Sequence, residues 1–195
     1  MDLQTLKRIF DENKSKHNID YEIKDEQLMI THSIAKGRNC LGFLPTGFGK
    51  TLCFVINAIT TTSDPLPLII SPLLSLMENQ IVALKEWTFT CARISADATT
   101  EDRTRISNGE FDFVFSSPES ILRPVWRKMF LTDTWQRRMS CITFDEAHCL
   151  SEWEEDFRPE YREMAQLRSF FKVPVMAVTA TSTTKVEEDI CQFYN

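Results

Sequence analysis

The sequence predicts a parallel, doubly wound α/β sheet flanked by helices, and three observations support this prediction. Short apolar runs of strand length alternate with segments of helical periodicity along the chain. A glycine-containing turn stands between the first of these runs and the next helix, and two adjacent acids follow a later run. Short apolar strands that alternate with helices are typical of a parallel sheet that helices cover on both faces.

Length and composition fit one domain over residues 1–195, with 43% hydrophobic and 26% charged residues. No apolar run approaches the roughly 20 residues that span a bilayer, and the N-terminus lacks the apolar core of a signal peptide. We therefore expect an intracellular location, nuclear in a eukaryote, and no membrane partner. A net charge of −6 gives no global basic surface, so any contact with nucleic acid has to be local.

The N-terminal residues 1–36 predict a helical lead-in. Leu3, Leu6 and Phe10 recur at helical spacing, and residues 24–36 carry a second helical pattern that ends at Gly37. The predicted strands are residues 40–44, 68–70, 91–95, 111–115, 141–144 and 175–178. The remaining predicted helices are residues 52–59, 74–84, 101–107, 125–131 and 183–194, with residues 60–67 as a loop.

The cysteines and two of the histidines suggest no metal site. The six cysteines stand singly, mostly in apolar runs, so we expect reduced core residues rather than zinc ligands or disulfides. His17 and His32 lack carboxylate or cysteine neighbours at metal-ligand spacing, and no role is predicted for them.

The turn from residue 41 to 51 has the order of a phosphate-binding loop. A strand leads into it, Gly47 and Gly49 permit positive φ, and a helix follows with its N–H groups facing an anion. Lys50 is placed to reach the β- and γ-phosphates, and the Thr51 hydroxyl to bind Mg²⁺. The strict pattern has glycine where Leu44 stands. The alternative is a glycine turn followed by a surface lysine.

Asp145 and Glu146 directly follow a predicted buried strand, where acids are costly without a function. We expect Asp145 to bind Mg²⁺ and Glu146 to orient and deprotonate an attacking water. The alternative is a pair of solvated acids at the start of a helix. Together with the glycine turn, they predict hydrolysis of a nucleoside triphosphate, with Lys50, Asp145 and Glu146 as catalytic residues.

With these residues, the chain resembles the first RecA-like domain of a superfamily 2 helicase, specifically of the RecQ family of DNA helicases. Residues 45–51 are similar to that family's motif I, which also tolerates a residue other than glycine at position 44. Residues 71–77 with Gln80 resemble motif Ia, residues 145–148 with Cys149 the DEAH form of motif II, and residues 178–181 motif III. The resemblance covers nearly the whole chain.

The resemblance implies ATP and Mg²⁺ as cofactors. Residues 23–27 are similar to motif 0, whose glutamine contacts the adenine edge, so Gln27 inherits that role. Lys24 stands where the family usually has arginine, which predicts a looser adenine clamp because lysine lacks the planar fork. The implied nucleotide-binding residues are Lys24, Gln27, Thr46, Gly47, Phe48, Gly49, Lys50 and Thr51. The implied metal ligands are Thr51 and Asp145.

The resemblance also suggests contacts with DNA. Residues 151–161 resemble the aromatic-rich loop that senses single-stranded DNA, where Trp153, Phe157 and Arg158 supply stacking faces and a cation. Glu154 and Glu155 replace the family's usual glycine and histidine and oppose a phosphate backbone, so a loop that merely anchors its aromatics stays an alternative. Further candidates are Ser71, Ser75 and Ser117.

Two sets of residues admit a packing role as well. His148 is either a core histidine or, as motif II implies, a link from the hydrolysis site to Thr179 and Thr181 of motif III. Leu73, Leu74 and Leu76, beside the candidate serines, are equally explained by core packing.

The expected function is the motor half of an ATP-dependent DNA helicase that acts on single-stranded or partially duplex DNA. Such motors close a second RecA-like domain over the nucleotide, and this chain encodes none, so we expect weak activity or none from the chain alone. If the chain is a piece of a longer helicase, that domain is its partner in cis. The alternatives are an RNA-remodelling superfamily 2 helicase and a non-catalytic docking module for nucleic acid or protein.

Overall fold

A computed structural model describes residues 1–61, 64–149, 164, 166–181 and 183–194. Within these residues, six parallel strands form one sheet in the order β1-β6-β5-β2-β4-β3, which confirms the predicted parallel α/β architecture. The strands are β1 (Cys40–Phe43), β2 (Leu66–Ile70), β3 (Cys91–Ile94), β4 (Phe113–Ser116), β5 (Met139–Asp145) and β6 (Val175–Thr179).

The helices alternate with the strands as the periodicity predicted. They are α1 (Leu3–Lys14), the 3₁₀ turn η1 (Ser15–His17), α2 (Asp25–Ala35), α3 (Lys50–Thr61), α4 (Leu74–Glu86), α5 (Thr100–Ser107), α6 (Pro118–Ile121), α7 (Pro124–Phe130), α8 (Asp133–Arg138) and α11 (Thr184–Tyr194). The short elements η1, α6 and α8 were not predicted. The predicted loop at 60–67 is wrong at both ends, because α3 continues through Thr61 and β2 begins at Leu66.

Local signals explain where the first helices begin and end. Asp2 caps α1, since its Oδ1 accepts a hydrogen bond from the Thr5 N–H at 2.8 Å. Leu6 and Phe10 are fully buried, as their spacing predicted. Gly37, with φ of 72°, follows α2 and allows the chain to turn into β1.

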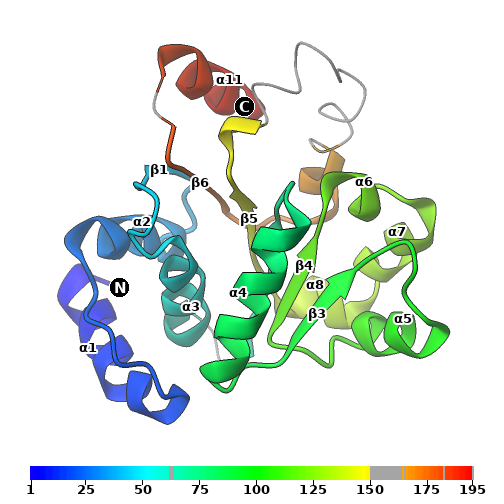
Figure 1. Ribbon diagram of the computed structural model, residues 1–195, viewed down its shortest axis with the longest axis horizontal. Helices are drawn as coiled ribbons and strands as arrows, with labels where there is room; N and C mark the ends of the chain where they lie inside the picture. The colour runs from blue at the N-terminus through cyan, green and yellow to red at the C-terminus, as the bar shows by residue number, and fades with distance from the viewer. Residues whose placement is uncertain (62–63, 150–163, 165, 182, 195) are drawn as a thin grey trace.

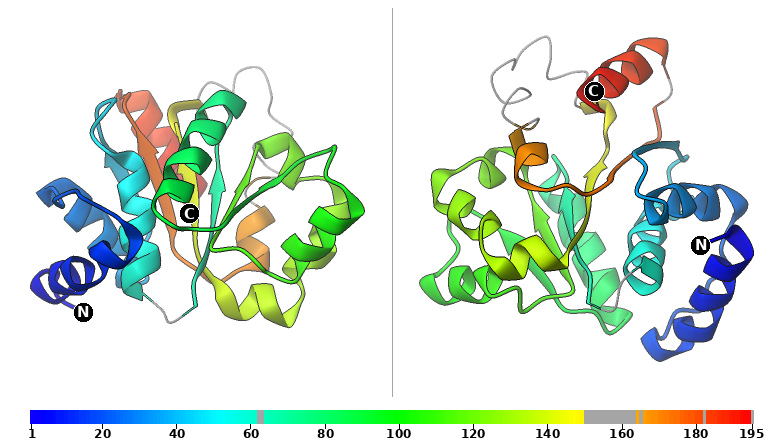
Figure 2. Two further views of the ribbon diagram at one scale, coloured as in Figure 1. Left: turned by 60° about the horizontal axis from the view of Figure 1, so that its bottom comes forward. Right: turned by 180° about the vertical axis from the view of Figure 1, so that it is seen from behind.

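The sheet has an apolar core on each face, because successive residues of a buried strand point to opposite sides. In β2, Ile69 packs with α1, α2, α3 and α4, whereas Leu68 and Ile70 pack on the other side with residues of α5, α7 and α8. Figure 1 shows α4 in front of the sheet, and the view from behind in Figure 2 brings α8 and the helical segment 166–170 forward. This double cover is the doubly wound arrangement.

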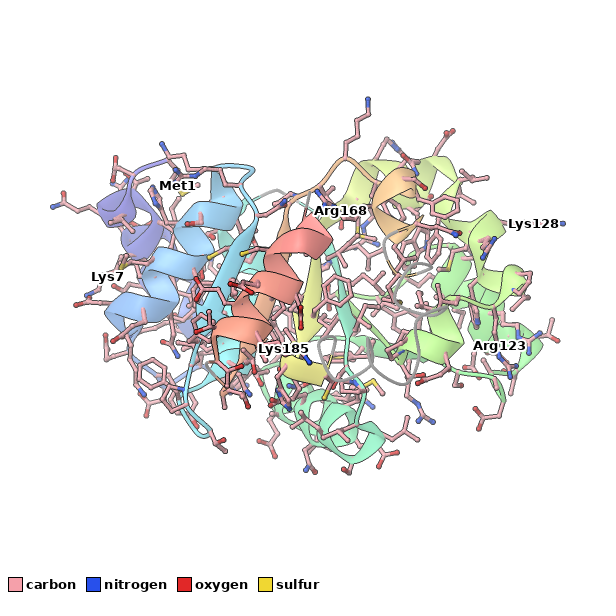
Figure 3. The ribbon with its side chains drawn as sticks, turned by 90° about the horizontal axis from the view of Figure 1, so that it is seen from above. Met1, Lys7, Arg123, Lys128, Arg168 and Lys185 are labelled. Atoms are coloured by element: carbon pink, nitrogen blue, oxygen red, sulfur yellow. The ribbon has the colours of Figure 1, made fainter. Side chains whose placement is uncertain are left out.

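The carboxyl ends of β1, β6 and β5 lie side by side at one edge of the sheet, at the top of Figure 1. Phe43 pairs with Thr179, and Asp145 pairs with Val178, so these three strands end at nearly the same level. Figure 3 looks down on this edge, with the N-terminal helices on the left and the α5–α8 half on the right. Loops that leave these strands therefore meet, as ligand-binding loops do in open α/β sheets.

Candidate functional site

The glycine turn connects β1 to α3 at this edge. Gly47 and Gly49 have φ of 77° and 89°, a region that residues with a Cβ seldom adopt. The Phe48 N–H donates to the Pro45 carbonyl at 3.0 Å and closes the turn. Thr46 lies exposed on the outside of the turn. The turn leads directly into the first residue of α3, as a phosphate-binding loop requires.

Leu44, the departure from the strict loop pattern, is a core residue. Its side chain is 1% exposed and packs in the cluster beneath α2 and α3. Its N–H donates to the Thr179 carbonyl at 2.9 Å and so extends the pairing of β1 with β6 by one residue. Leu44 therefore holds the start of the turn to the sheet and does not interrupt the turn.

Gln27 at the first turn of α2 is buried, and its amide bonds both to the backbone of the glycine turn and to the backbone at the cap of its own helix. Its Nε2 donates to the carbonyls of Phe48 at 2.9 Å and Gly49 at 3.2 Å, and its Oε1 accepts from the Lys24 N–H at 2.9 Å. The Lys24 ammonium lies 3.9 Å from the centre of the Phe48 ring. The structure thus brings both predicted adenine residues onto the loop, and Gln27 clips the loop to α2.

The two acids end β5 beside this loop, and they occupy different environments. Asp145 is 2% exposed, and its Oδ2 accepts a hydrogen bond from Gln80 Nε2 at 2.8 Å. Glu146 follows with φ of 50°, a left-handed conformation that costs a non-glycine residue about 1–2 kcal/mol. Its Oε1 accepts a hydrogen bond from Lys50 Nζ, and both side chains are largely shielded from water. The structure therefore brings the three predicted catalytic residues together.

Burial raises the pKa of Asp145, while the hydrogen bond from Gln80 and the positive charge of Lys50 oppose that shift. Its Oδ1 is buried and has no hydrogen-bond partner among the described residues. A buried carboxylate oxygen without a partner is costly, and a cation would satisfy it.

Asp145 and Thr51, which lies in the first turn of α3, both carry hard oxygen atoms at this edge. Mg²⁺ prefers such atoms and usually takes one or two protein ligands plus phosphates and water. The residues present therefore fit Mg²⁺.

His148 of motif II lies beside Thr179 of motif III. Its Nδ1 is 2.9 Å from Thr179 Oγ1 and 3.4 Å from Glu146 Oε2, while its Nε2 is 3.6 Å from Cys149 Sγ. Thr179 Oγ1 also accepts a hydrogen bond from the Thr181 N–H at 3.1 Å. The histidine is only partly buried, and polar atoms surround it, so these contacts argue against a purely apolar core role.

The DNA candidates lie in different settings. Ser71 is fully buried, and its Oγ has no partner among the described residues, whereas Ser75 is exposed on the first turn of α4. Ser117 caps α6, because its side chain accepts from the Ser120 N–H. The core explanation is wrong for Leu73 and Leu74, which are about half exposed. The aromatic-rich candidates Trp153, Phe157 and Arg158 lie outside the described residues.

Gln80 is the site residue to which the sequence assigned no role. The signal was present, because Met77, Gln80 and Leu84 share the buried face of α4 and Gln80 is its polar member. Only the fold reveals that its amide reaches Asp145, 65 positions along the chain.

The prediction of core cysteines holds for two of the six. Cys53 and Cys141 are buried, and burial raises the pKa of each thiol to about 12. Cys40, Cys91 and Cys149 are half-buried. Cys191 is exposed, because it lies on the outer side of α11, one position after the buried Ile190. No disulfide joins any of them. Among the described residues, no helix is long and apolar enough to cross a membrane.

Comparisons with known proteins agree with the fold and the motifs. The family model "DEAD/DEAH box helicase" matches residues 24–190. The chain is 33% identical over 171 residues to the ATP-dependent DNA helicase RecQ of Haemophilus influenzae. The alignment covers 85% of this chain and 27% of that protein. It is 36% identical to the probable ATP-dependent DNA helicase RecS of Bacillus subtilis, covering 86% of this chain and 33% of that protein. The chain thus spans about a quarter to a third of these relatives.

Solved structures share the architecture at lower identity. The helicase MrfA bound to DNA aligns with a TM-score of 0.68 at 20% identity, over 97% of this chain and 28% of MrfA. The SWI2/SNF2 ATPase core of Sulfolobus solfataricus in complex with double-stranded DNA aligns with a TM-score of 0.66 at 19% identity, over 91% of this chain and 36% of the core. These similarities support the RecA-like fold, and the family match covers motifs I, Ia, II and III. The chain belongs to the DEAD/DEAH box helicase family.

Proposed function

We propose that this chain is the ATP- and Mg²⁺-binding half of a RecQ-like DNA helicase motor. The observation that carries the proposal is the convergence of the glycine turn with the two acids of β5, where Lys50 pairs with Glu146 beside the buried Asp145. A lysine on the first residue of a helix after a glycine turn, facing an acid pair, is the arrangement that phosphoryl transfer uses. Similarity to RecQ and RecS supports the proposal that the nucleic acid is DNA.

Lys50 has two partners in this mechanism. Phosphate oxygens at the N-terminus of α3 compete with Glu146 for the ammonium, and the helix N–H groups add to that attraction. When the Lys50 ammonium binds the phosphates, Glu146 loses its partner, and its carboxylate is able to accept a proton from the attacking water. The pair therefore links phosphate binding to the release of the base.

Thr51 and the Asp145 Oδ1 would hold Mg²⁺, which when bound neutralises charge on the phosphates. The adenine end lies with Gln27 and Lys24. Because the Gln27 amide is committed to the loop carbonyls, we propose that it fixes the loop and presents its edge to the base only at the cost of one of these bonds. Lys24 is exposed, and its ammonium lies over the Phe48 ring, so we propose that the two side chains form the solvent-facing side of the adenine site.

We propose that His148 transmits to motif III whether Glu146 is paired with Lys50. It contacts the Glu146 carboxylate on one side and Thr179 on the other, and Thr181 bonds to the same hydroxyl. Breaking the Lys50–Glu146 pair changes the charge that His148 faces. The motif III strand, β6, also borders β1, so a shift there reaches the glycine turn.

The nucleotide-binding experiment measures ATP affinity with and without Mg²⁺, for the wild type and Lys50→Ala. We expect Mg²⁺-dependent binding by the wild type and a loss of at least about tenfold in Lys50→Ala, since a hydrogen bond to a charged group is worth about 1.5–3 kcal/mol. Exposed Lys128 on α7 gives a matched control, Lys128→Ala, with unchanged binding. Equal binding by wild type and Lys50→Ala would contradict the proposal.

A non-catalytic docking module is the second candidate. Leu73 and Leu74 are exposed at the start of α4, and the net charge of −6 disfavours a broad phosphate surface. Absence of Mg²⁺-dependent ATP binding would favour this candidate. An RNA-remodelling helicase is distinguished from a DNA helicase by a competition assay. If the RecQ-like proposal holds, single-stranded DNA displaces a labelled oligonucleotide better than RNA of the same sequence does.

A further inference from the structure

Gln80 is a buried amide with one side-chain bond. It lies on α4, and its Nε2 donates to Asp145 Oδ2 at 2.8 Å. Its side chain is 6% exposed, and its Oε1 has no hydrogen-bond partner among the described residues. A buried amide oxygen without a partner costs about 1–3 kcal/mol, so packing alone favours an apolar residue of the same size. The bond to Asp145 is what the glutamine adds.

That bond gives the two carboxylate oxygens of Asp145 different environments. Oδ2 is occupied by the Gln80 amide, whereas Oδ1 is buried and has no partner among the described residues. A carboxylate that is held at one oxygen cannot rotate freely, so the other oxygen keeps one direction. Partners of this kind orient a metal ligand, and their loss typically costs about 10- to 100-fold in metal affinity.

The same helix begins at the molecular surface. Leu73, Leu74 and Ser75 are exposed at the start of α4, while Met77, Gln80 and Leu84 form its buried face. An α-helix is a stiff element, so a displacement of its first turn moves Gln80 relative to β5. About two turns of α4 separate its exposed first residue, Leu74, from Gln80.

We propose that Gln80 is a positioning residue, which holds Asp145 with Oδ1 directed to the divalent cation and connects the exposed start of α4 to that carboxylate. This inference rests on the proposed function, since it assigns Gln80 a role at the same Mg²⁺ site. Gln80 itself touches neither the cation nor the nucleotide and acts through Asp145.

The test is a Mg²⁺ titration of the binding of a fluorescent ATP analogue, with EDTA samples for the metal-free affinity. Gln80→Met keeps the length and volume of the side chain and removes the donor. We expect the Mg²⁺ concentration for half-maximal binding to rise about 10- to 100-fold, while the affinity in EDTA stays within about twofold. The adjacent exposed residue provides the control Asn79→Met, with both values unchanged.

A double variant separates positioning from structure. If Gln80 acts through Asp145, Gln80→Met has no further effect on the Mg²⁺ midpoint in an Asp145→Asn background, because the two residues form one unit. If Gln80→Met does not fold, Gln80→Glu replaces the donor by an acceptor at the same size and takes its place, with a midpoint shift in the same direction.

Three outcomes decide the matter. A raised Mg²⁺ midpoint for Gln80→Met that disappears in the double variant supports the inference. Equal losses with Mg²⁺ and with EDTA, or an unchanged midpoint, overturn it and leave the proposed function standing. Binding by the wild type that is indifferent to Mg²⁺ overturns the proposed function and the inference with it.

Discussion

Lys50 and Glu146 form the ion pair on which the proposed chemistry depends, and each has a competing partner. Phosphate oxygens compete for the ammonium of Lys50, and His148 lies 3.4 Å from the second oxygen of Glu146. The sequence identified both residues because each follows a strand end. Their contact, across 96 positions, required the strand order.

Glu146→Gln should separate binding from hydrolysis. The amide no longer competes as a charge for Lys50, so we expect equal or up to about tenfold tighter ATP binding, since a charged hydrogen bond is worth about 1.5–3 kcal/mol. Turnover should fall at least about 100-fold, because the general base is lost. Fluorescent-nucleotide titration and single-turnover hydrolysis measure the two effects, with exposed Glu119→Gln as the control. Weaker binding by Glu146→Gln than by the control would argue against competition for Lys50.

Asp145 should make the fold less stable as pH rises. Its folded pKa lies above the ordinary value of 3.8, chiefly because of burial, so the folded state holds its proton to higher pH than the unfolded state does. Stability is then greatest below the ordinary pKa and declines as pH rises through the folded pKa. Asp145→Asn carries no such charge.

The measurement is the melting temperature of wild type and Asp145→Asn in EDTA from pH 4 to pH 7. We expect the variant's melting temperature, minus that of the wild type, to increase with pH. A difference that is constant or decreases with pH would show that the folded pKa is not raised. Asp133→Asn, at an exposed position of α8, controls for the substitution itself.

At the scale of elements, β1 and the turn after it depend on Leu44. The strict phosphate-loop pattern treated this residue as a defect, whereas its side chain is a core member and its N–H extends the pairing to β6. A pattern of residue types cannot show this, because the burial of position 44 depends on α2 and α3 packing above it.

Leu44→Ala should cost about 2–5 kcal/mol in the free energy of unfolding, the range for a buried leucine that leaves a cavity. Leu73→Ala, at an exposed position before α4, should stay within about 0.5 kcal/mol. Urea denaturation measures both. Similar small losses for the two variants would mean that Leu44 is not a core residue.

Prediction of elements succeeded where periodicity was long and failed where it was short. Residues 74–84 gave a clear helical face, but α6 and α8 contain only 4 and 6 residues, too few for a periodic pattern. The start of β2 was missed because Pro67 lies within it, and prolines usually interrupt strands. The pairing of β2 with β5 shifts register between Leu66 and Leu68, which accommodates this proline.

At the scale of the whole molecule, the sequence predicted a parallel sheet but not the order of its strands. Each apolar run is a local signal, whereas the order β1-β6-β5-β2-β4-β3 depends on non-local pairing. That order places the ends of β1, β6 and β5 together and so assembles the site. The net charge of −6 remains the feature least suited to binding DNA. The basic side chains of Lys7, Arg123 and Lys128, labelled in Figure 3, lie on the outer flanks of the molecule.

The 195-residue chain alone should hydrolyse ATP slowly and should not unwind duplex DNA. An arginine finger is worth about 10³- to 10⁵-fold in phosphoryl transfer, and the resemblance to RecQ helicases implies that a second RecA-like domain supplies it. A phosphate-release assay with and without single-stranded DNA measures this. Robust ATP turnover that DNA stimulates further would contradict the expectation.

The central claim is that the glycine turn and the acids of β5 form one site for Mg²⁺ and ATP. A crystal structure with a non-hydrolysable ATP analogue and Mn²⁺, whose anomalous signal locates the metal, tests this most directly. We predict the terminal phosphates on Lys50 and the metal beside Asp145 Oδ1 and Thr51, with the Lys50–Glu146 pair broken. Phosphates bound elsewhere, or a metal remote from Asp145, would contradict it.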